Sequence, residues 1–122
     1  MDQNKLENIY TYCKEHSELD SQNLVDLEKY TWANKEVPQM ISGKLVGKFL
    51  QSIIKMINAK KIIEVGTFTG YSAIQMAEAI SDKGEVHTCE IMEKHAQTAQ
   101  TFFDRSENGH KIFRLQKNQR CS

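Results

Sequence analysis

The 122-residue sequence has little of several features that would direct it to particular classes of protein. It contains no run of about 18 apolar residues, so we expect no transmembrane helix and no membrane partner. Its N-terminus is polar and lacks the apolar core of a signal peptide. It also lacks a charge excess, because 16 basic residues balance 16 acidic ones, which argues against nucleic acid as a partner.

Cysteine and histidine are scarce and scattered along the chain. The three cysteines (Cys13, Cys89 and Cys121) are odd in number and lack metal-binding or redox spacing, and the four histidines form no zinc pattern. Free thiols in a reducing, cytoplasmic environment are therefore expected. The length predicts one domain with a modest core.

Residues 1–58 show the apolar spacing of helices, and we expect them to form a helical lead-in. The predicted inward faces are Leu6, Ile9, Tyr10 and Cys13 in the first helix, Leu24, Leu27 and Tyr30 in the second, and Leu45, Phe49, Ile53, Met56 and Ile57 in the third. Asp20 or Ser21 is expected to cap the second helix. Pro38, the only proline, separates the second helix from the third.

Residues 59–115 alternate between strands and helices. The expected strands are 61–65, 85–91 and 111–115, and the expected helices between them are 71–80 and 93–105. Ile62, Ile63 and Val65 form a short apolar run in the first strand, which predicts burial on both of its faces. Connections long enough for helices predict parallel strands, here in the spatial order 3-2-1. The fold class is thus α/β, with N-terminal helices followed by the first half of a Rossmann-like parallel sheet.

The C-terminal residues 116–122 are polar and aperiodic. We interpret them either as a frayed, disordered tail or as out-of-frame sequence after a truncation, and we expect the domain to end at residue 115.

A glycine-containing turn after the first strand is the clearest indication of a ligand site. Gly66 and Gly70 have the spacing Gly-x-x-x-Gly, which differs from the Gly-x-Gly-x-x-Gly of a dinucleotide-binding turn and disfavours NAD. Gly66 lets the backbone approach a ligand, because no Cβ blocks it. The helix that begins near Tyr71 offers free N–H groups, and Ser72 adds a hydroxyl donor. A tight turn without a ligand is the structural alternative.

Two carboxylates flank this turn in the predicted fold. Glu90 ends the second strand, where its two oxygens can accept hydrogen bonds from both hydroxyls of a ribose; a solvated charge is the alternative. Glu64 interrupts the apolar first strand, where a buried carboxylate needs a partner, either a ligand ammonium or backbone donors of the turn. A ligand with an ammonium, a carboxylate and a ribose but no phosphate is S-adenosylmethionine (SAM), which we expect as the cofactor.

The segment Glu-Val-Gly-Thr-Phe-Thr-Gly-Tyr-Ser, residues 64–72, resembles the first motif of the cation-dependent, SAM-dependent O-methyltransferases, the group of catechol and caffeoyl-CoA O-methyltransferases. Residues 38–50 and 82–90 resemble the lead-in helix and the second strand of that family. The resemblance implies that Met40 and Ser42 lie beside the cofactor, that Glu64, Gly66, Phe68, Tyr71 and Ser72 surround its methionine part, and that Glu90 and Ile91 contact its ribose and adenine. For Met40, plain packing is the alternative.

The resemblance further implies a divalent cation, magnesium, held by carboxylates and an amide from a later segment, with a lysine that deprotonates the acceptor hydroxyl. After Ile112 the sequence contains no aspartate, so we assign no metal ligand and no catalytic residue. We therefore expect an O-methyltransferase by family, acting on a hydroxyl of a small, catechol-like acceptor. The chain itself is expected to be a truncated, inactive, cofactor-binding half.

Two other functions compete with this interpretation. The chain is alternatively a non-catalytic remnant or association module that at most binds the cofactor, and a dinucleotide-dependent oxidoreductase ranks third. Self-association is expected in either of the first two cases, through the N-terminal helices or the exposed edge of the first strand.

Overall fold

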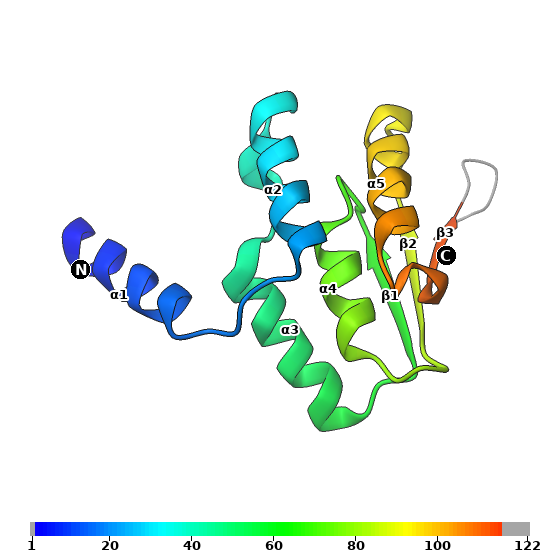
Figure 1. Ribbon diagram of the computed structural model, residues 1–122, viewed down its shortest axis with the longest axis horizontal. Coiled ribbons are helices and arrows are strands. Elements are labelled where there is room, and N and C mark those ends of the chain that lie inside the picture. Colours follow the sequence, from blue (N-terminus) through cyan, green and yellow to red (C-terminus); the bar gives the residue numbers. More distant parts are fainter. Residues whose placement is uncertain (1, 116–122) are drawn as a thin grey trace.

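The computed structural model describes residues 2–115, so both interpretations of residues 116–122 lie outside the described part of the chain. The described residues form an α/β fold with a three-stranded parallel sheet (Figure 1). Its helices and strands are α1 (Gln3–Glu15), α2 (Gln22–Asn34), α3 (Gly43–Ile57), β1 (Lys61–Val65), α4 (Tyr71–Ala79), β2 (Glu85–Cys89), α5 (Glu93–Arg105) and β3 (Ile112–Leu115). Short 3₁₀ turns, η1 (Pro38–Met40) and η2 (Gly109–Lys111), precede α3 and β3.

The sheet has the predicted order, with β2 between β1 and β3 and all three strands parallel. Lys61 pairs with Glu85 and Val65 pairs with Cys89, so the carboxyl ends of β1 and β2 lie side by side. The turn that follows β1 and the residues that follow β2 therefore meet at one edge of the sheet. In open α/β sheets this is the edge where ligands bind.

Helix α4 is central to the helical layer, since it packs on α3, α2 and β2. It contributes Ala73, Ile74 and Ala77 to the main core, where they are fully buried with Leu24 and Leu27 of α2. Helix α5 has the predicted bounds and buries Ala96, Ala99, Phe102 and Phe103, as expected from their spacing.

The prediction that β1 is buried on both faces is wrong. Ile62 packs against the core, whereas the side chains of Ile63 and Val65, which point to the opposite face, are 76% and 80% exposed. The helical layer packs on one face of the sheet through α4, and no other element between residues 2 and 115 buries Ile63 or Val65.

The predicted inward face of α3 is also wrong, because Phe49, Met56 and Ile57 are exposed. The helix packs on α4 through Gly47, Gln51 and Ile54 instead. A Cβ at Gly47 would lie 2.6 Å from the Gln75 side chain, so glycine allows the close approach of the two helices. Gln51 then donates from Nε2 to the carbonyl oxygen of Gln75 at 2.8 Å.

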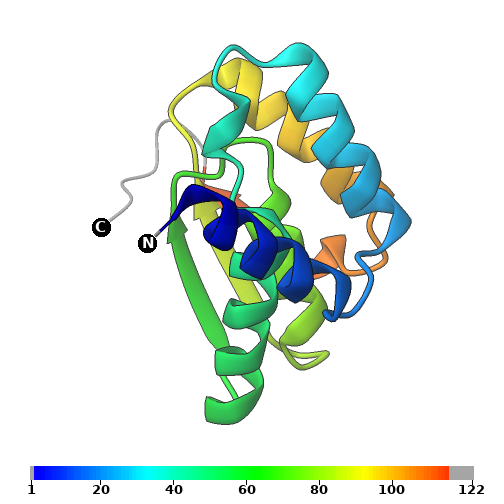
Figure 2. The same cartoon turned by 90° about the vertical axis from the view of Figure 1, so that its left-hand side faces the viewer.

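The predicted face of α1 is not buried either. Leu6, Ile9, Tyr10 and Cys13 are all exposed, and they line an open hollow of about 670 Å³ whose other side includes Leu45 of α3. Helix α1 projects from the body of the molecule in Figure 1 and crosses α3, the helix that it contacts, in Figure 2. In the described part of the chain, no helix combines the length and the apolarity that a membrane span requires.

Candidate functional site

The turn between β1 and α4 has a backbone that favours glycine at two positions. Gly66 and Gly70 have φ angles of 97° and 96°, and Phe68 also has a positive φ of 49°. A Cβ at Gly70 would lie 2.7 Å from Phe103, so this glycine is needed for packing on α5. A Cβ at Gly66 would meet nothing within 4 Å, so the backbone there is open to close approach by another molecule.

Hydrogen bonds fix this turn to the end of β2. The amides of Gly66 and Thr67 both donate to the carbonyl oxygen of Cys89, at 2.9 and 3.1 Å. Gly70 caps α4 without a side-chain hydrogen bond, so the first N–H groups of α4 have no side-chain acceptor at the cap. These N–H donors, together with the helix dipole, favour a negatively charged group such as a carboxylate.

A hollow of about 40 Å³ lies between this turn and the η1–α3 connection. Six of the predicted site residues line it: Met40, Ser42, Gly66, Phe68, Tyr71 and Ser72. The remaining lining residues are Ile41, Thr67 and Thr69. The structure thus brings together residues that lie more than twenty positions apart in the sequence. The hollow has room for only a few atoms.

Glu64 lies below the turn and has two hydroxyl partners. Its Oε2 accepts a hydrogen bond from Ser72, and its Oε1 accepts one from Thr88 Oγ1 at 2.7 Å. Burial raises the pKa of Glu64, the two hydroxyl donors lower it, and the nearby charge of Glu90 raises it further. The turn backbone, predicted as one of two alternative partners, does not donate to Glu64. The hydroxyl of Ser72, predicted as a donor to the ligand, donates to Glu64 instead, together with that of Thr88, which was not predicted.

Thr88 is therefore a site residue that sequence reasoning missed. Thr88 pairs with Glu64 across the parallel register of β1 and β2, and its hydroxyl also contacts that of Thr67. The register places this fully buried threonine beside the carboxylate of the neighbouring strand, and no pattern in the sequence indicated that pairing.

Glu90 connects the turn to the start of α5. Its Oε1 accepts a hydrogen bond from the amide of Phe68 at 2.8 Å, and its Oε2 accepts one from the amide of Met92 at 3.1 Å. Each oxygen retains a further lone pair for a ligand hydroxyl. The ribose role of Glu90 stays a prediction, as does the adenine contact of Ile91, whose side chain is exposed next to it.

His95, which we treated only as one of four scattered histidines, lies behind the turn. It is 8% exposed, and its ring meets that of Phe68 edge to face with centroids 4.9 Å apart. Burial, followed by the charge of Lys35, lowers the pKa of His95 and favours the neutral ring. No hydrogen-bond partner reaches its Nδ1 in the described structure. Nothing in the sequence pattern identified this neighbour of Phe68.

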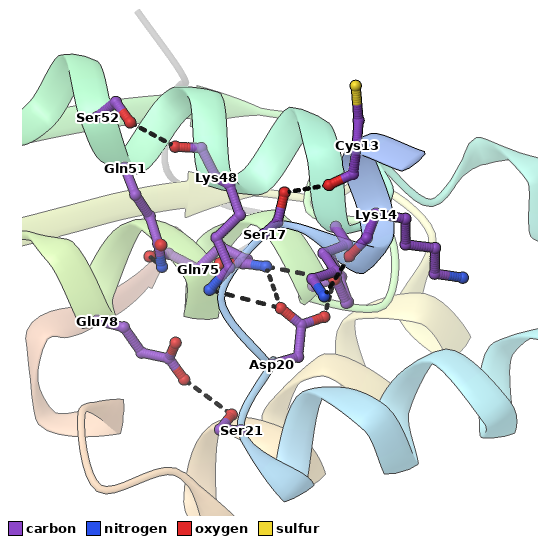
Figure 3. A network of polar contacts seen from close by, with 12 residues as sticks. Cys13, Lys14, Ser17, Asp20, Ser21, Lys48, Gln51, Ser52, Gln75 and Glu78 are labelled. Atoms are coloured by element: carbon purple, nitrogen blue, oxygen red, sulfur yellow. Dashed lines mark hydrogen bonds and ion pairs between the residues drawn. The ribbon is translucent and has the colours of Figure 1, made fainter. Parts of the chain in front are cut away.

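Of the two residues predicted to cap α2, Ser21 is confirmed at the cap position and Asp20 is not. Ser21 occupies the cap position without a capping hydrogen bond and donates instead to Glu78 Oε1 at 2.9 Å (Figure 3). Asp20 turns toward α4, where the hydroxyl of Tyr71 donates to it. Tyr71, a predicted cofactor neighbour, is consequently held by the connection between α1 and α2.

The described residues contain no group of three or more His, Cys, Asp or Glu side chains that could hold a metal ion. The features that do fit a ligand are the open backbone at Gly66, the start of α4 without a side-chain capping hydrogen bond, and the half-buried carboxylates of Glu64 and Glu90. They suit a molecule that carries both a cationic and an anionic group together with hydroxyls.

Solved structures of methyltransferases share this fold. An O-methyltransferase from Bacillus cereus in complex with SAH (S-adenosylhomocysteine) is similar with a TM-score of 0.81 and 28% identity, over 88% of this chain and 49% of that chain. TomG from Streptomyces achromogenes, an O-methyltransferase solved in complex with SAM, has a TM-score of 0.85 at 23% identity, over 93% of this chain and 51% of that one.

Curated relatives agree with the structural likeness. A probable caffeoyl-CoA O-methyltransferase from Dictyostelium discoideum is 32% identical over 104 residues, which cover 85% of this chain and 45% of the relative. A catechol O-methyltransferase from Niastella koreensis is 47% identical over 60 residues, or 49% of this chain and 27% of the relative. The chain spans less than half the length of these relatives. The family described as O-methyltransferase matches residues 14–120, and this chain therefore belongs to the O-methyltransferase family.

Proposed function

We propose that this chain is the SAM-binding half of an O-methyltransferase and that the hollow at the β1–α4 turn forms part of the site for the methionine part of the cofactor. One observation carries the proposal. Residues from two separate segments, Met40 and Ser42 before α3 and Gly66 to Ser72 after β1, line the same hollow. The B. cereus relative that was solved with SAH supports the same class of ligand.

Each group of the cofactor has a matching feature of the chain in this proposal. Glu64 receives the ammonium, and the N–H groups at the start of α4 receive the carboxylate. Glu90 accepts the ribose hydroxyls while it holds Phe68 and Met92, and Ile91 covers the adenine. Bound SAM supplies an electrophilic methyl group, and the residues of this chain bind and orient the molecule that carries it.

Calorimetric titration tests this proposal. We expect the chain to bind SAM and SAH, and to bind NAD much more weakly or not at all, because its glycines lack the dinucleotide spacing. Asp26→Asn is a matched control, since Asp26 pairs with Arg105 at 2.8 Å on the surface and does not line the hollow. Binding of NAD without binding of SAH would contradict the proposal.

For the whole reaction, we propose methyl transfer from SAM to a hydroxyl of a small, catechol-like acceptor. The names of the D. discoideum and N. koreensis relatives support this class of reaction. In the family, magnesium and its ligands are implied to come from a later segment, and these relatives are more than twice as long as the part that this chain matches.

We propose that this chain alone does not catalyse that transfer and acts as a cofactor-binding or association module. Incubation of the pure chain with labelled SAM and a catechol, with and without Mg²⁺, tests this. We expect no transfer in either condition, and magnesium-stimulated labelling of the catechol would contradict it.

A further inference from the structure

Asp20, in the connection between α1 and α2, accepts hydrogen bonds from α4 (Figure 3). Tyr71 Oη donates to its Oδ2, and Gln75 Nε2 donates to its Oδ1 at 3.0 Å. Lys48 of α3 approaches the same Oδ1 with its Nζ at 3.7 Å. Side chains from α3 and α4 thus converge on one carboxylate of the connection, and the side chain of Asp20 is only 5% exposed.

The partners of Asp20 are themselves held in place. Tyr71 is 2% exposed and Gln75 is fully buried, and Gln75 Nε2 also lies 3.2 Å from Tyr71 Oη. Gln75 packs directly against Gly47, where even a methyl group would clash with it. Burial, followed by the hydrogen bond to Asp20, raises the pKa of Tyr71, so its hydroxyl stays protonated and donates. A buried carboxylate requires such donors, because it is costly without them.

The same Tyr71 forms part of the candidate cofactor site. It begins α4 and lines the hollow next to Ser72, which in turn donates to Glu64. A shift of Tyr71 would therefore change the shape of the hollow, and Asp20 holds Tyr71 in place through its hydroxyl. Asp20 does not line the hollow.

We propose that Asp20 is a positioning residue that orients Tyr71 for the cofactor and thereby couples cofactor binding to the docking of the α1–α2 connection on α4. This inference rests on the proposed function, because the hollow must bind SAM or SAH. Coupling between two equilibria is reciprocal, so bound cofactor also stabilises the docked connection.

A double-mutant cycle on SAH affinity tests the coupling. Asp20→Asn replaces one carboxylate oxygen by an amide donor and should weaken SAH binding roughly three- to tenfold, the scale of coupling between contacting residues. Tyr71→Phe keeps the ring and removes the hydroxyl, and it should weaken binding similarly. In the Tyr71→Phe background, Asp20→Asn should change the affinity less than about twofold. The matched control Asp26→Asn should leave SAH affinity unchanged.

Hydrogen exchange gives a second readout that does not depend on the Asp20 variant folding. In the wild-type chain, saturating SAH should slow amide exchange in residues 16–21, and Tyr71→Phe should abolish most of that slowing. Chemical denaturation of each variant identifies any that are not folded at the titration temperature.

The outcomes separate the two proposals. If the wild-type chain binds no SAH, both are overturned. If it binds SAH and either Asp20→Asn binds equally well or the effect persists in the Tyr71→Phe background, the inference alone is overturned. Unchanged exchange of residues 16–21 on SAH binding would also overturn it.

Discussion

Two opposing effects act on the pKa of Glu64. Burial favours the neutral carboxyl and raises the pKa, whereas two hydroxyl donors favour the charged carboxylate and lower it. Burial has the largest effect, so the folded chain holds the Glu64 proton more tightly than the unfolded chain does. The contribution of Glu64 to stability therefore falls as pH rises through the raised pKa. A cationic ligand would compensate for this cost.

We expect SAH affinity to increase as pH rises from the usual carboxyl range through the raised pKa of Glu64, and then to level off. The ligand ammonium favours the ionised carboxylate, so binding below that pKa releases the proton. Titrations over a pH series measure this, and Glu64→Gln should flatten the profile. A wild-type profile that matches that of Glu64→Gln would mean that Glu64 does not receive the ammonium.

Removal of the Glu90 carboxylate should weaken SAH binding by roughly 1–3 kcal/mol, the scale of hydrogen bonds to charged groups. Glu90→Ala also frees the amides of Phe68 and Met92, so its unfolding curve must be measured beside its calorimetric affinity. Glu85→Ala, at the opposite end of β2, is the matched control and should bind SAH like the wild-type chain. Undiminished binding by Glu90→Ala would exclude the ribose role.

At the scale of the elements, the two glycines of the β1–α4 turn have different surroundings, because Gly70 packs against Phe103 and Gly66 has open space where a side chain would be. Both Gly66 and Gly70 have φ angles near 97°, so alanine at either position is strained at a cost of about 1 kcal/mol or more. Gly70→Ala adds the clash with Phe103 and should lose clearly more stability. Gly66→Ala should keep more of the stability but lose most of the SAH affinity. Denaturation and titration of both variants check this, and equal SAH affinity of Gly66→Ala and wild type would contradict it.

The helices and strands could be predicted from the sequence more accurately than the faces that they bury. The strand order and the bounds of α5 follow from periodicity and chain connectivity, and both are confirmed. The buried face of α3 does not follow from apolar spacing, because Gly47 and the two glutamines Gln51 and Gln75 form its contact with α4. Contacts made by glycine and by polar side chains leave no apolar periodicity in the sequence, so this face could not be predicted from it.

Some residues of the candidate site could likewise be predicted from the sequence, and others could not. The motif at residues 64–72 pointed to the turn, and the family resemblance pointed to Met40 and Ser42. Met40 and Ser42 line the same hollow as four of the predicted turn residues. Thr88, His95 and Asp20 were missed, because their roles depend on strand register, on packing against Phe68 and on the path of the connection after α1. Such relations between distant segments arise only in the folded chain.

At the scale of the whole molecule, apolar surface remains exposed on three elements. Ile63 and Val65 of β1, Phe49, Met56 and Ile57 of α3, and Leu6, Ile9 and Tyr10 of α1 contribute to it. Strand β1 is also at the edge of the described sheet, where its outer backbone groups have no partner strand. Surface of this kind promotes association.

We expect the chain to self-associate and to be only marginally stable. Val65→Lys places a charge on the exposed face of β1 and should reduce the mass measured by light scattering without lowering stability. Lys61→Arg, on the same face of β1, is a control that keeps the charge there unchanged. A monodisperse wild-type monomer with an unfolding free energy above about 5 kcal/mol, the range of complete domains, would contradict this expectation.

The central claim is that this chain holds SAM or SAH at the β1–α4 turn, and amide hydrogen exchange with and without SAH tests it most directly. The fold and the hollow predict slower exchange at residues 66–72 and 90–92 on saturation with SAH, with little change in β3. Binding that leaves residues 66–72 unprotected, or no binding at all, would contradict the claim.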